Sequence, residues 1–310
     1  MSVISPSSNE AGTQVSYGYC SVRVSGQPQL GILLGDQVAL LRDVTVDSGF
    51  AVPVTVMELL GLIAETSAQV DAAILDGTFE KAAWDSGTIE FLPPVSSPQN
   101  IFCAGANYAD HIAEMGLTVS ALGKRPFHFL KSAGTLLGHR QIVQRPPGCQ
   151  RLDWEVELAV VIGCEAWQVQ AENAANCICG YMVANDLSAR DFALENPQLG
   201  IDWLRQKTFR GSLPIGPALV PSTQVPDPMN LRMSLTLNGS VMQQSSTSVM
   251  IFDIATQISA LSHLIPLKRG DIILTGTPAG TGRTHNRYLT SGDVLIAEIG
   301  GIGRLITEIS

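Results

Sequence analysis

Apolar and polar positions alternate along much of this chain, and this pattern predicts many short β-strands. Residues 17–24, 30–34 and 37–41 alternate and are separated by glycine-containing turns, which predicts a small antiparallel sheet. Apolar runs predict further strands at residues 100–107, 127–131, 156–163, 178–184, 231–237 and 272–275. Asn238 and Gly239 follow one of these runs and form a strong hairpin signal.

The sequence also predicts several helices, which are fewer than the predicted strands. Residues 55–62 have a capping-box spacing, with Thr55 as the N-cap and Glu58 three positions later. Further helices are predicted at residues 68–84, 108–116, 171–175 and 250–264, and a helix start with capping spacing at 188–191. A Pro- and Ser-rich segment at 91–98 predicts a domain boundary. We therefore expect a disordered lead-in at 1–14, a small N-terminal α+β domain at 15–95 and a larger domain at 96–310.

The composition excludes several classes of protein. The 310 residues are 45% hydrophobic and 15% charged, with a net charge of -9, which argues against partners such as nucleic acid and against a polybasic membrane patch. No apolar stretch approaches the length of a membrane span. Residues 1–14 contain no Lys or Arg, so we expect neither a secretory signal nor a transit peptide. Six scattered cysteines without a C-x-x-C pair are typical of reduced, packed thiols in a cytoplasmic protein.

Two glutamates, Glu155 and Glu157, precede the apolar run at 158–163. In a strand Glu155 and Glu157 point to the same face, while Trp154, Val156 and Leu158 point to the other. Two like charges beside a buried segment repel each other, and a bound divalent cation would compensate for this repulsion. A solvent-facing edge strand with two free glutamates is an equally good interpretation of this stretch alone.

Other candidate groups lie near predicted strand ends and helices. His111 and Glu114 are three positions apart, so on a helix they form either a general base with its orienting carboxylate or a surface pair. Asp186 lies just after the strand at 178–184 and could add a third oxygen ligand for a hard cation. Lys131 could hold an anionic substrate or extend its amine to solvent.

Three further charges and a glycine-rich loop have less specific interpretations. Arg190 and Asp191 favour a structural role in locking a turn, and an isolated Lys207 on a loop is usually solvated. Residues 276–282 are glycine-rich but lack both the P-loop and the dinucleotide-binding patterns. Their backbone N–H groups, with Thr277, could still cradle a carboxylate.

Together these motifs resemble the fumarylacetoacetate hydrolase family. The matching stretches are residues 105–116, 153–163, 183–191, 207–209, 238–239, 250–252 and 274–280, in the family's order from about residue 99 to the C-terminus. Residues 1–95 resemble only in general the smaller N-terminal domain of many bacterial-type members. The resemblance implies an α+β, β-rich fold, a mixed-β roll or sandwich with short helices, and a homodimer.

The resemblance also implies roles for individual residues. The Mg²⁺ or Mn²⁺ ligands fall on Glu155, Glu157 and Asp186, and Ca²⁺ can replace these ions in crystals. The catalytic dyad falls on His111 and Glu114. A substrate-binding, catalytic lysine falls on Lys207, and the remaining substrate contacts are expected from Asn107, Tyr108, Lys131, Gly276 and Thr277.

Family substrates are small anionic 2-oxo or 1,3-dicarbonyl carboxylates. We expect a metal-dependent hydrolase that cleaves a C–C bond in an acylpyruvate-like substrate through a metal-stabilised enolate, with His111 activating water. The usual family glutamine after the Ser-Ala-Arg-Asp run is Ala193 here, with Gln198 or Gln206 as substitutes. This departure leaves open a lyase or isomerase, such as an oxaloacetate decarboxylase, a hydratase or a dehydratase. A non-catalytic binding protein is a third hypothesis, against which the complete triad and dyad argue.

Overall fold

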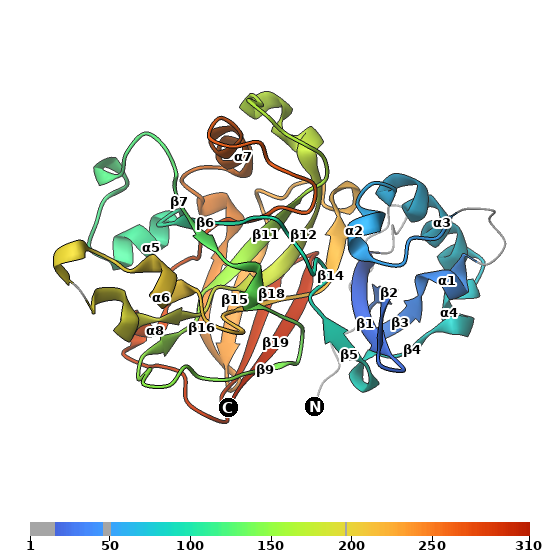
Figure 1. The fold of residues 1–310 in the computed structure, drawn as a ribbon, viewed down its shortest axis with the longest axis horizontal. Coiled ribbons are helices and arrows are strands. Elements are labelled where there is room, and N and C mark those ends of the chain that lie inside the picture. The colour runs from blue at the N-terminus through green and yellow to red at the C-terminus, as the bar shows by residue number, and fades with distance from the viewer. Residues whose placement is uncertain (1–15, 46–50, 196) are drawn as a thin grey trace.

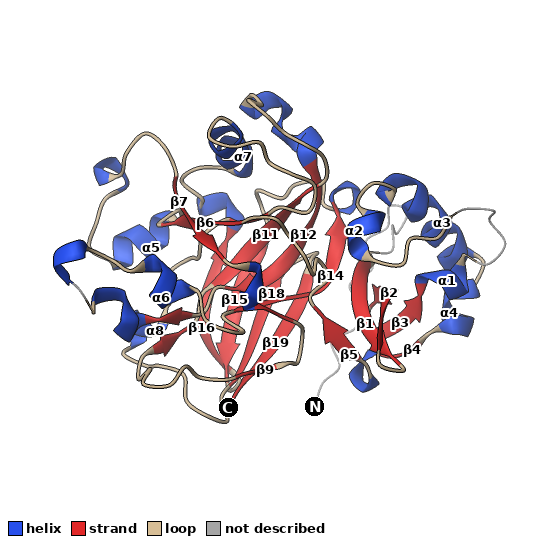
Figure 2. Cartoon of the chain, in the orientation of Figure 1, coloured by secondary structure: helices blue, strands red, loops and turns tan. Residues whose placement is uncertain are grey.

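Strands run through the middle of the molecule and short helices lie along its edges (Figure 2). The structure is a computed structural model that describes residues 16–45, 51–195 and 197–310. Several sheets with short helices make it α+β and β-rich, which confirms the predicted fold class. The predicted lead-in at 1–14 lies outside the described residues. Among the residues that are described, no helix is long and apolar enough to cross a membrane.

The N-terminal region of the chain lies at one end of the molecule, on the right in Figure 1. Its strands are β1 (Gly18–Val24), β2 (Gln27–Leu34), β3 (Gln37–Leu40), β4 (Trp84–Asp85) and β5 (Glu90–Leu92). Its helices are α1 (Leu41–Val44), α2 (Val56–Leu59), α3 (Ile63–Leu75) and α4 (Thr78–Ala82). β1, β2 and β3 pair antiparallel, as the alternating pattern predicts. Thr55 caps α2 by accepting a hydrogen bond from the Glu58 N–H at 3.2 Å, which confirms the predicted cap.

Two predictions for this region were wrong. The expected helix at 68–84 is two helices, because Gly77 between α3 and α4 has φ +76°, a left-handed conformation that ends a helix. The expected linker at 91–98 begins inside β5, where the buried Phe91 pairs with Val22 of β1. The domain boundary near residue 95 stays a prediction.

A long mixed sheet crosses the molecule. Its further strands are β6 (Ile101–Gly105), β7 (Phe127–Lys131), β8 (Leu136–Leu137), β11 (Val156–Ile162), β12 (Ile178–Asn185), β14 (Leu213–Pro221) and β17 (Ile272–Leu274). The main order is β4-β3-β2-β1-β14-β12-β11-β17-β6-β7. β1 pairs with β14 at Tyr19 and Leu219, so the N-terminal strands extend the sheet that contains β11 and β12.

A second sheet packs against the first. It consists of β9 (Ile142–Val143), β15 (Arg232–Leu237), β16 (Ser240–Ser246), β18 (Val294–Ile299) and β19 (Gly303–Ile309), and a separate pair joins β10 (Leu152–Asp153) to β13 (Ser188–Ala189). The predicted hairpin links β15 to β16, with φ +50° at Asn238 and +84° at Gly239. These left-handed values suit the Asn-Gly sequence.

The remaining helices are short and lie around the sheets. The α-helices are α5 (Ala109–Glu114), α6 (Trp203–Lys207), α7 (Ile254–Ser262) and α8 (Gly282–His285). The 3-10 helices are η1 (Ser86–Thr88), η2 (Val119–Ala121), η3 (Ala133–Thr135), η4 (Ala171–Cys177), η5 (Arg190–Leu194), η6 (Pro197–Leu199), η7 (Ser222–Gln224) and η8 (Thr247–Val249). The helix start predicted at 188–191 is therefore a two-residue strand followed by η5.

The two faces of β11 enter two different apolar clusters. Leu158 and Val160 pack toward the second sheet, whereas Ala159 and Val161 pack toward the cluster that includes the N-terminal helices. All four side chains are fully buried, and burial of each larger one contributes about 1.5–3 kcal/mol. This burial fixes the register of β11 and therefore the direction of the glutamates before and at its start.

A buried histidine connects the N-terminal region to the second sheet. The His139 Nδ1 accepts a hydrogen bond from the Ile306 N–H at 3.1 Å, and the ring packs edge-on against Phe91 at 5.2 Å. Burial, with the charges of Arg140 and Arg304, lowers the pKa of His139 to about 4. Because Nδ1 must be unprotonated to accept this hydrogen bond, protonation breaks the contact.

This contact predicts a pH-dependent stability. The pKa of His139 lies below its unfolded value of about 6.5, so its contribution is complete above that pH and is lost as the pH falls toward 4. Between pH 7.5 and pH 5, wild type should lose about 2 kcal/mol more unfolding free energy than His139→Gln. Urea unfolding at both pH values measures this difference. His263→Gln, at an exposed histidine, should behave like wild type, and an equal pH response of all three proteins would contradict the assignment.

Candidate active site

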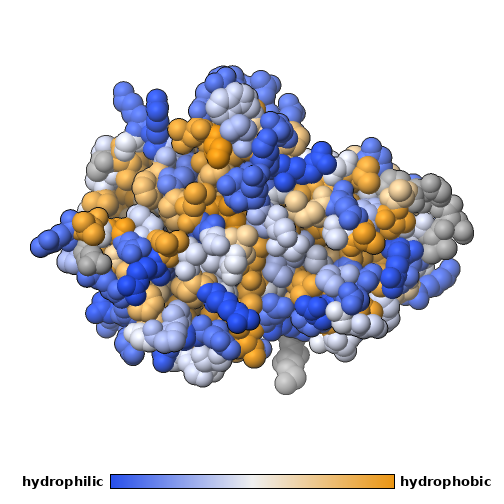
Figure 3. All heavy atoms as spheres, viewed as in Figure 1, coloured by the Kyte–Doolittle hydropathy of each residue, from blue (hydrophilic) through white to orange (hydrophobic). Residues whose placement is uncertain are grey.

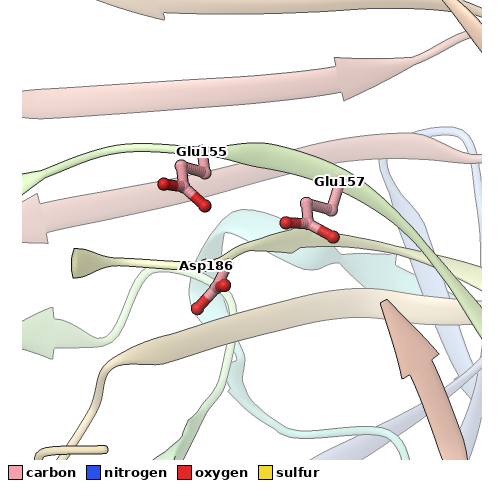
Figure 4. A group of neighbouring side chains, drawn as sticks. All are labelled: Glu155, Glu157 and Asp186. Atoms are coloured by element: carbon pink, nitrogen blue, oxygen red, sulfur yellow. The ribbon is translucent and has the colours of Figure 1, made fainter. Parts of the chain in front are cut away.

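Three buried carboxylates converge at the ends of two neighbouring strands (Figure 4). Glu155 and Glu157 come from the start of β11, and Asp186 follows β12. β11 and β12 are antiparallel, with Val156 opposite Asn185, so the start of one lies beside the end of the other. One oxygen from each of the three carboxylates lies within 4.8 Å of the others. The side chains are directed together as the alternation of the strand predicts.

Three cationic side chains surround this cluster. The Lys207 Nζ lies 2.6 Å from the Glu155 Oε2 and 2.7 Å from the Asp186 Oδ2. The Lys131 Nζ lies 2.6 Å from the Asp186 Oδ1. Arg190 donates through its NH2 group to the Glu155 Oε1 at 2.7 Å. Lys207 is therefore not a solvated loop charge, and Lys131 does not extend to solvent, because both amines are buried in ion pairs.

The two glutamates have opposite electrostatic environments. Burial raises the pKa of Glu155, but the charges of Lys207 and Arg190 outweigh it and leave this pKa at about 2. Burial and the charges of Asp186 and Glu155 raise the pKa of Glu157 well above its ordinary value. The pKa of Lys207 is raised because Asp186 and Glu155 outweigh the opposing effect of its burial. Glu157 is thus the carboxylate whose negative charge is least compensated.

The donor set fits a hard divalent cation. The Glu157 Oε2 accepts a hydrogen bond from the Gly276 N–H at 2.6 Å, and no described residue donates one to its Oε1. An unpaired oxygen on a buried carboxylate is costly, and Mg²⁺, Mn²⁺ or Ca²⁺ prefers such oxygen ligands. Glu155, Glu157 and Asp186 are the residues that would hold the ion.

The predicted dyad is present beside this cluster. The His111 Nδ1 and the Glu114 Oε1 are 2.6 Å apart on α5, and both side chains are largely buried, so they are not an exposed surface pair. The Glu114 Oε2 accepts a hydrogen bond from the Gly280 N–H at 2.9 Å. His111 also lines the cavity above the carboxylates. Because Nδ1 is held by Glu114, Nε2 is the ring nitrogen left to exchange a proton with a ligand.

Asp110 anchors this helix and was missed by the sequence reasoning. Its Oδ2 accepts a hydrogen bond from the Ser245 hydroxyl at 2.5 Å, and its Oδ1 accepts from the Ala279 N–H at 3.3 Å. These contacts hold α5 against β16 and the 276–282 loop. Helical spacing gave no signal for them, because adjacent residues on a helix do not share a face.

The residues predicted to bind substrate divide into two groups. Thr277 lines the cavity, with its hydroxyl donating to the Val156 carbonyl at 2.9 Å. The Asn107 amide is fully used by backbone groups of Phe252 and Thr275. The Tyr108 hydroxyl donates a hydrogen bond to the Met233 Sδ. The Gly276 N–H donates to Glu157, and the Lys131 ammonium donates to Asp186. These four hold the framework of the site, and direct contact with substrate stays a prediction for them.

A cavity of about 410 Å³ opens over the carboxylates. Its polar wall includes His111, Glu155, Glu157, Lys207, Arg190, Arg151, Arg283 and Thr277, and its apolar wall includes Met115, Phe129, Ala193, Leu194, Ile201 and Trp203. Exposed apolar side chains gather over the part of the surface near α5, α6 and β7 in Figure 3. The cavity can therefore take a small anion with a short organic body.

Arg190 and Asp153 also belong to the site. Arg190, interpreted as structural, bridges Asp153 and Glu155 and lines the cavity. Asp153 is fully buried and also accepts hydrogen bonds from the Gly282 and Trp154 N–H groups. The sequence did contain a signal for Asp153, since residues 153, 155 and 157 follow the period of two that places side chains on one face of a strand.

Known proteins resemble this chain in sequence and in fold. The family model described as fumarylacetoacetate (FAA) hydrolase C-terminal matches residues 100–310. A mitochondrial oxaloacetate tautomerase of Bos taurus is 41% identical over 223 residues, covering 71% of this chain and 69% of that protein. The fumarylacetoacetate hydrolase of psychrophilic Exiguobacterium antarcticum has a TM-score of 0.77 at 28% identity, covering 95% of this chain and 99% of its own. A fumarylpyruvate hydrolase from Pseudomonas aeruginosa, solved with Mn²⁺ and pyruvate, has a TM-score of 0.63 at 29% identity. The match covers 71% of this chain and 91% of that protein's chain.

The carboxylate cluster predicts opposite effects of Glu157→Gln on metal binding and on stability. Loss of the charge should weaken Mn²⁺ binding by at least roughly 100-fold, which is the upper range for loss of a group that only orients a metal ligand. In EDTA at pH 8 the same variant should be more stable than wild type by about 1 kcal/mol or more, because a repelled buried charge is removed. Calorimetric titration and thermal unfolding measure the two effects.

Glu165→Gln is the matched control, since Glu165 is an exposed carboxylate that pairs with Lys268. It should leave both Mn²⁺ binding and stability close to wild type. Unchanged Mn²⁺ affinity in Glu157→Gln would show that the ion is held elsewhere.

Proposed function

The chain belongs to the fumarylacetoacetate hydrolase family and is an enzyme, and from this premise we propose that it is a divalent-metal-dependent tautomerase of a short 2-oxo dicarboxylate such as oxaloacetate. The observation that supports this most is the combination of the carboxylate cluster with one oriented histidine, in a chain 41% identical to a protein named oxaloacetate tautomerase. Mg²⁺ or Mn²⁺ is the proposed ion. The homodimer and the cytoplasmic location stay predictions.

Tautomerisation needs a group that transfers a proton and a positive charge that stabilises the enolate. A proton leaves C3, the C2 carbonyl becomes an enol, and a proton is delivered to the oxygen on C2, or the reverse sequence occurs. A divalent cation, when bound, supplies the positive charge that stabilises the enolate of a 2-oxo acid. Atoms and charge balance without water as a reactant and without cleavage of a C–C bond.

The residues of this chain supply the proton transfer and the charge. Nε2 of His111 is the proposed base and acid, and Glu114 holds the ring through Nδ1 so that Nε2 faces the cavity. Gly280 fixes the other oxygen of Glu114, which restricts the rotation of the pair. Lys207 and Arg190 place positive charge beside the cavity floor, where an incoming carboxylate would otherwise meet repulsion from Glu155 and Glu157.

Hydrolysis of an acylpyruvate is the second candidate function. The same histidine could accept a proton from water instead of carbon, and the P. aeruginosa relative is named a fumarylpyruvate hydrolase. We place it second because Ala193 presents a methyl group to the cavity at the position where family hydrolases commonly carry a glutamine. A decarboxylase, hydratase or dehydratase would use the same enolate chemistry.

Parallel assays distinguish these reactions. With Mg²⁺ or Mn²⁺ we expect fast decay of the enol absorbance of oxaloacetate, and a kcat/KM for acylpyruvate hydrolysis lower by about 100-fold or more, the discrimination that pocket contacts reach. Product analysis of CO₂ and pyruvate separates decarboxylation from tautomerisation. The double variant Glu155→Gln, Asp186→Asn gives the background due to free metal. Acylpyruvate cleavage that outpaces tautomerisation would favour the second candidate.

The dyad makes a separate prediction. His111→Gln should lower kcat by about 100- to 10,000-fold, the usual contribution of general acid–base catalysis. Glu114→Gln should lower it by a smaller factor, since the base remains but its ring is less well oriented. Mn²⁺ affinity should change little in either variant, and His263→Gln should keep full activity. Wild-type turnover by His111→Gln would remove the dyad from the mechanism.

A further inference from the structure

Gln206 is a buried residue of α6 whose side-chain amide has no partner among the residues that the structure describes. It is 4% exposed and lines the cavity next to Lys207. Its backbone N–H donates to the Asp202 carbonyl at 3.0 Å, as expected in a helix. No described group forms a hydrogen bond with its side-chain oxygen or nitrogen.

This is unusual for a buried amide, because buried polar groups are nearly always paired. Among the other amides of this region, Gln243 follows the rule, whereas the buried Asn185 Nδ2 has no partner among the described residues but does not line the cavity. Gln243 donates to Thr277 and to the Pro278 carbonyl and accepts from the Val156 N–H. A buried amide that lines a cavity without a partner is a group left available for a ligand.

The wall around Gln206 is otherwise apolar. Ala193 accepts a hydrogen bond from the Asp202 N–H through its backbone at 2.9 Å, so η5 and the start of α6 form one surface. Trp203 stacks on Phe129 with ring centroids 4.8 Å apart. The neighbouring Lys207 ammonium is turned to Glu155 and is unavailable to this wall. The amide of Gln206 is therefore a neutral group on this side of the cavity that can both donate and accept hydrogen bonds, whereas the Trp203 indole can only donate.

Positive charge lies near the cavity as well. Arg151 and Arg283 both line it, and no described residue forms an ion pair with the guanidinium of Arg283. A ligand bound to the carboxylate cluster would thus share the cavity with a guanidinium and with the Gln206 amide. Both groups donate hydrogen bonds to a carboxylate.

We propose that Gln206 is a specificity-determining residue that donates a hydrogen bond to the distal carboxylate of the substrate. This inference rests on the proposed function in one respect, namely that the substrate is a short 2-oxo dicarboxylate. The amide binds the end of the molecule that does not react, so it selects dicarboxylates over monocarboxylates that lack the distal carboxylate.

A pair of unreactive ligands tests the proposal without turnover. Malate and lactate both offer a carboxylate and a 2-hydroxyl group, and malate alone adds a distal carboxylate. In Mn²⁺-loaded protein, Gln206→Met should raise the Kd of malate by about 10-fold or more and that of lactate by less than about 3-fold. Gln198→Met is the control, because Gln198 is exposed and lies outside the cavity, and it should bind both ligands like wild type.

Two further variants protect the test against a folding defect. Gln206→Glu places a negative charge near the distal carboxylate and should weaken malate more than lactate. Ala193→Gln, added to Gln206→Met, returns an amide from the adjoining η5 and should restore some of the malate affinity. Circular dichroism and Mn²⁺ titration establish that each variant is folded and loaded.

The kinetic signature separates this role from a structural one. For oxaloacetate, Gln206→Met should raise KM by about 10-fold while kcat stays within about 3-fold, since the amide contacts the unreactive end. Equal weakening of malate and lactate, or no change in either, would overturn the proposal. If wild type does not tautomerise oxaloacetate but the malate preference still depends on Gln206, the proposed function fails and the role of the amide stands.

Discussion

Repulsion among three buried carboxylates is the constraint on which the rest of this structure depends. One oxygen from each lies within 4.8 Å of the others, a distance at which unscreened like charges are strongly unfavourable. Lys131 from β7, Lys207 from α6 and Arg190 from η5 each donate to members of the cluster. Three elements that are distant in sequence are therefore drawn to one point by charge, and Glu157 remains available for a cation.

Apolar burial holds the carboxylates together against this repulsion. β11 and β12 are buried on both faces, and their alternate residues enter two clusters that together extend from the second sheet to the N-terminal helices. A strand fixed in this way cannot turn its glutamates to solvent without moving the residues behind them. In the long sheet β14 alone separates β12 from β1, so the N-terminal strands also support the position of Asp186.

Local periodicity explains which features of the site could be predicted from the sequence. The period of two placed Glu155 and Glu157 on one face, and helical spacing paired His111 with Glu114. Partners of Lys207 and Asp110 could not be predicted, because they lie on elements whose distance in sequence carries no periodic signal. For the same reason the apolar pattern predicted many of the short strands, the fold class came from the family resemblance, and the pairing of Phe91 with β1 could not be predicted.

The 276–282 loop determines how this site tolerates genetic change. Its backbone N–H groups donate to Glu157, Asp110, Glu114 and Asp153. Main-chain donors persist when the side chain of Thr277, Ala279 or Thr281 is exchanged. The glycines are different, because a Cβ at Gly280 or Gly282 would lie 2.1 or 2.3 Å from a backbone oxygen and would displace the donor. An insertion or deletion of one residue would shift every donor after it and misalign the metal ligand and the dyad together. The site is therefore sensitive both to the length of this loop and to replacement of its glycines, and it tolerates changes at the other loop side chains.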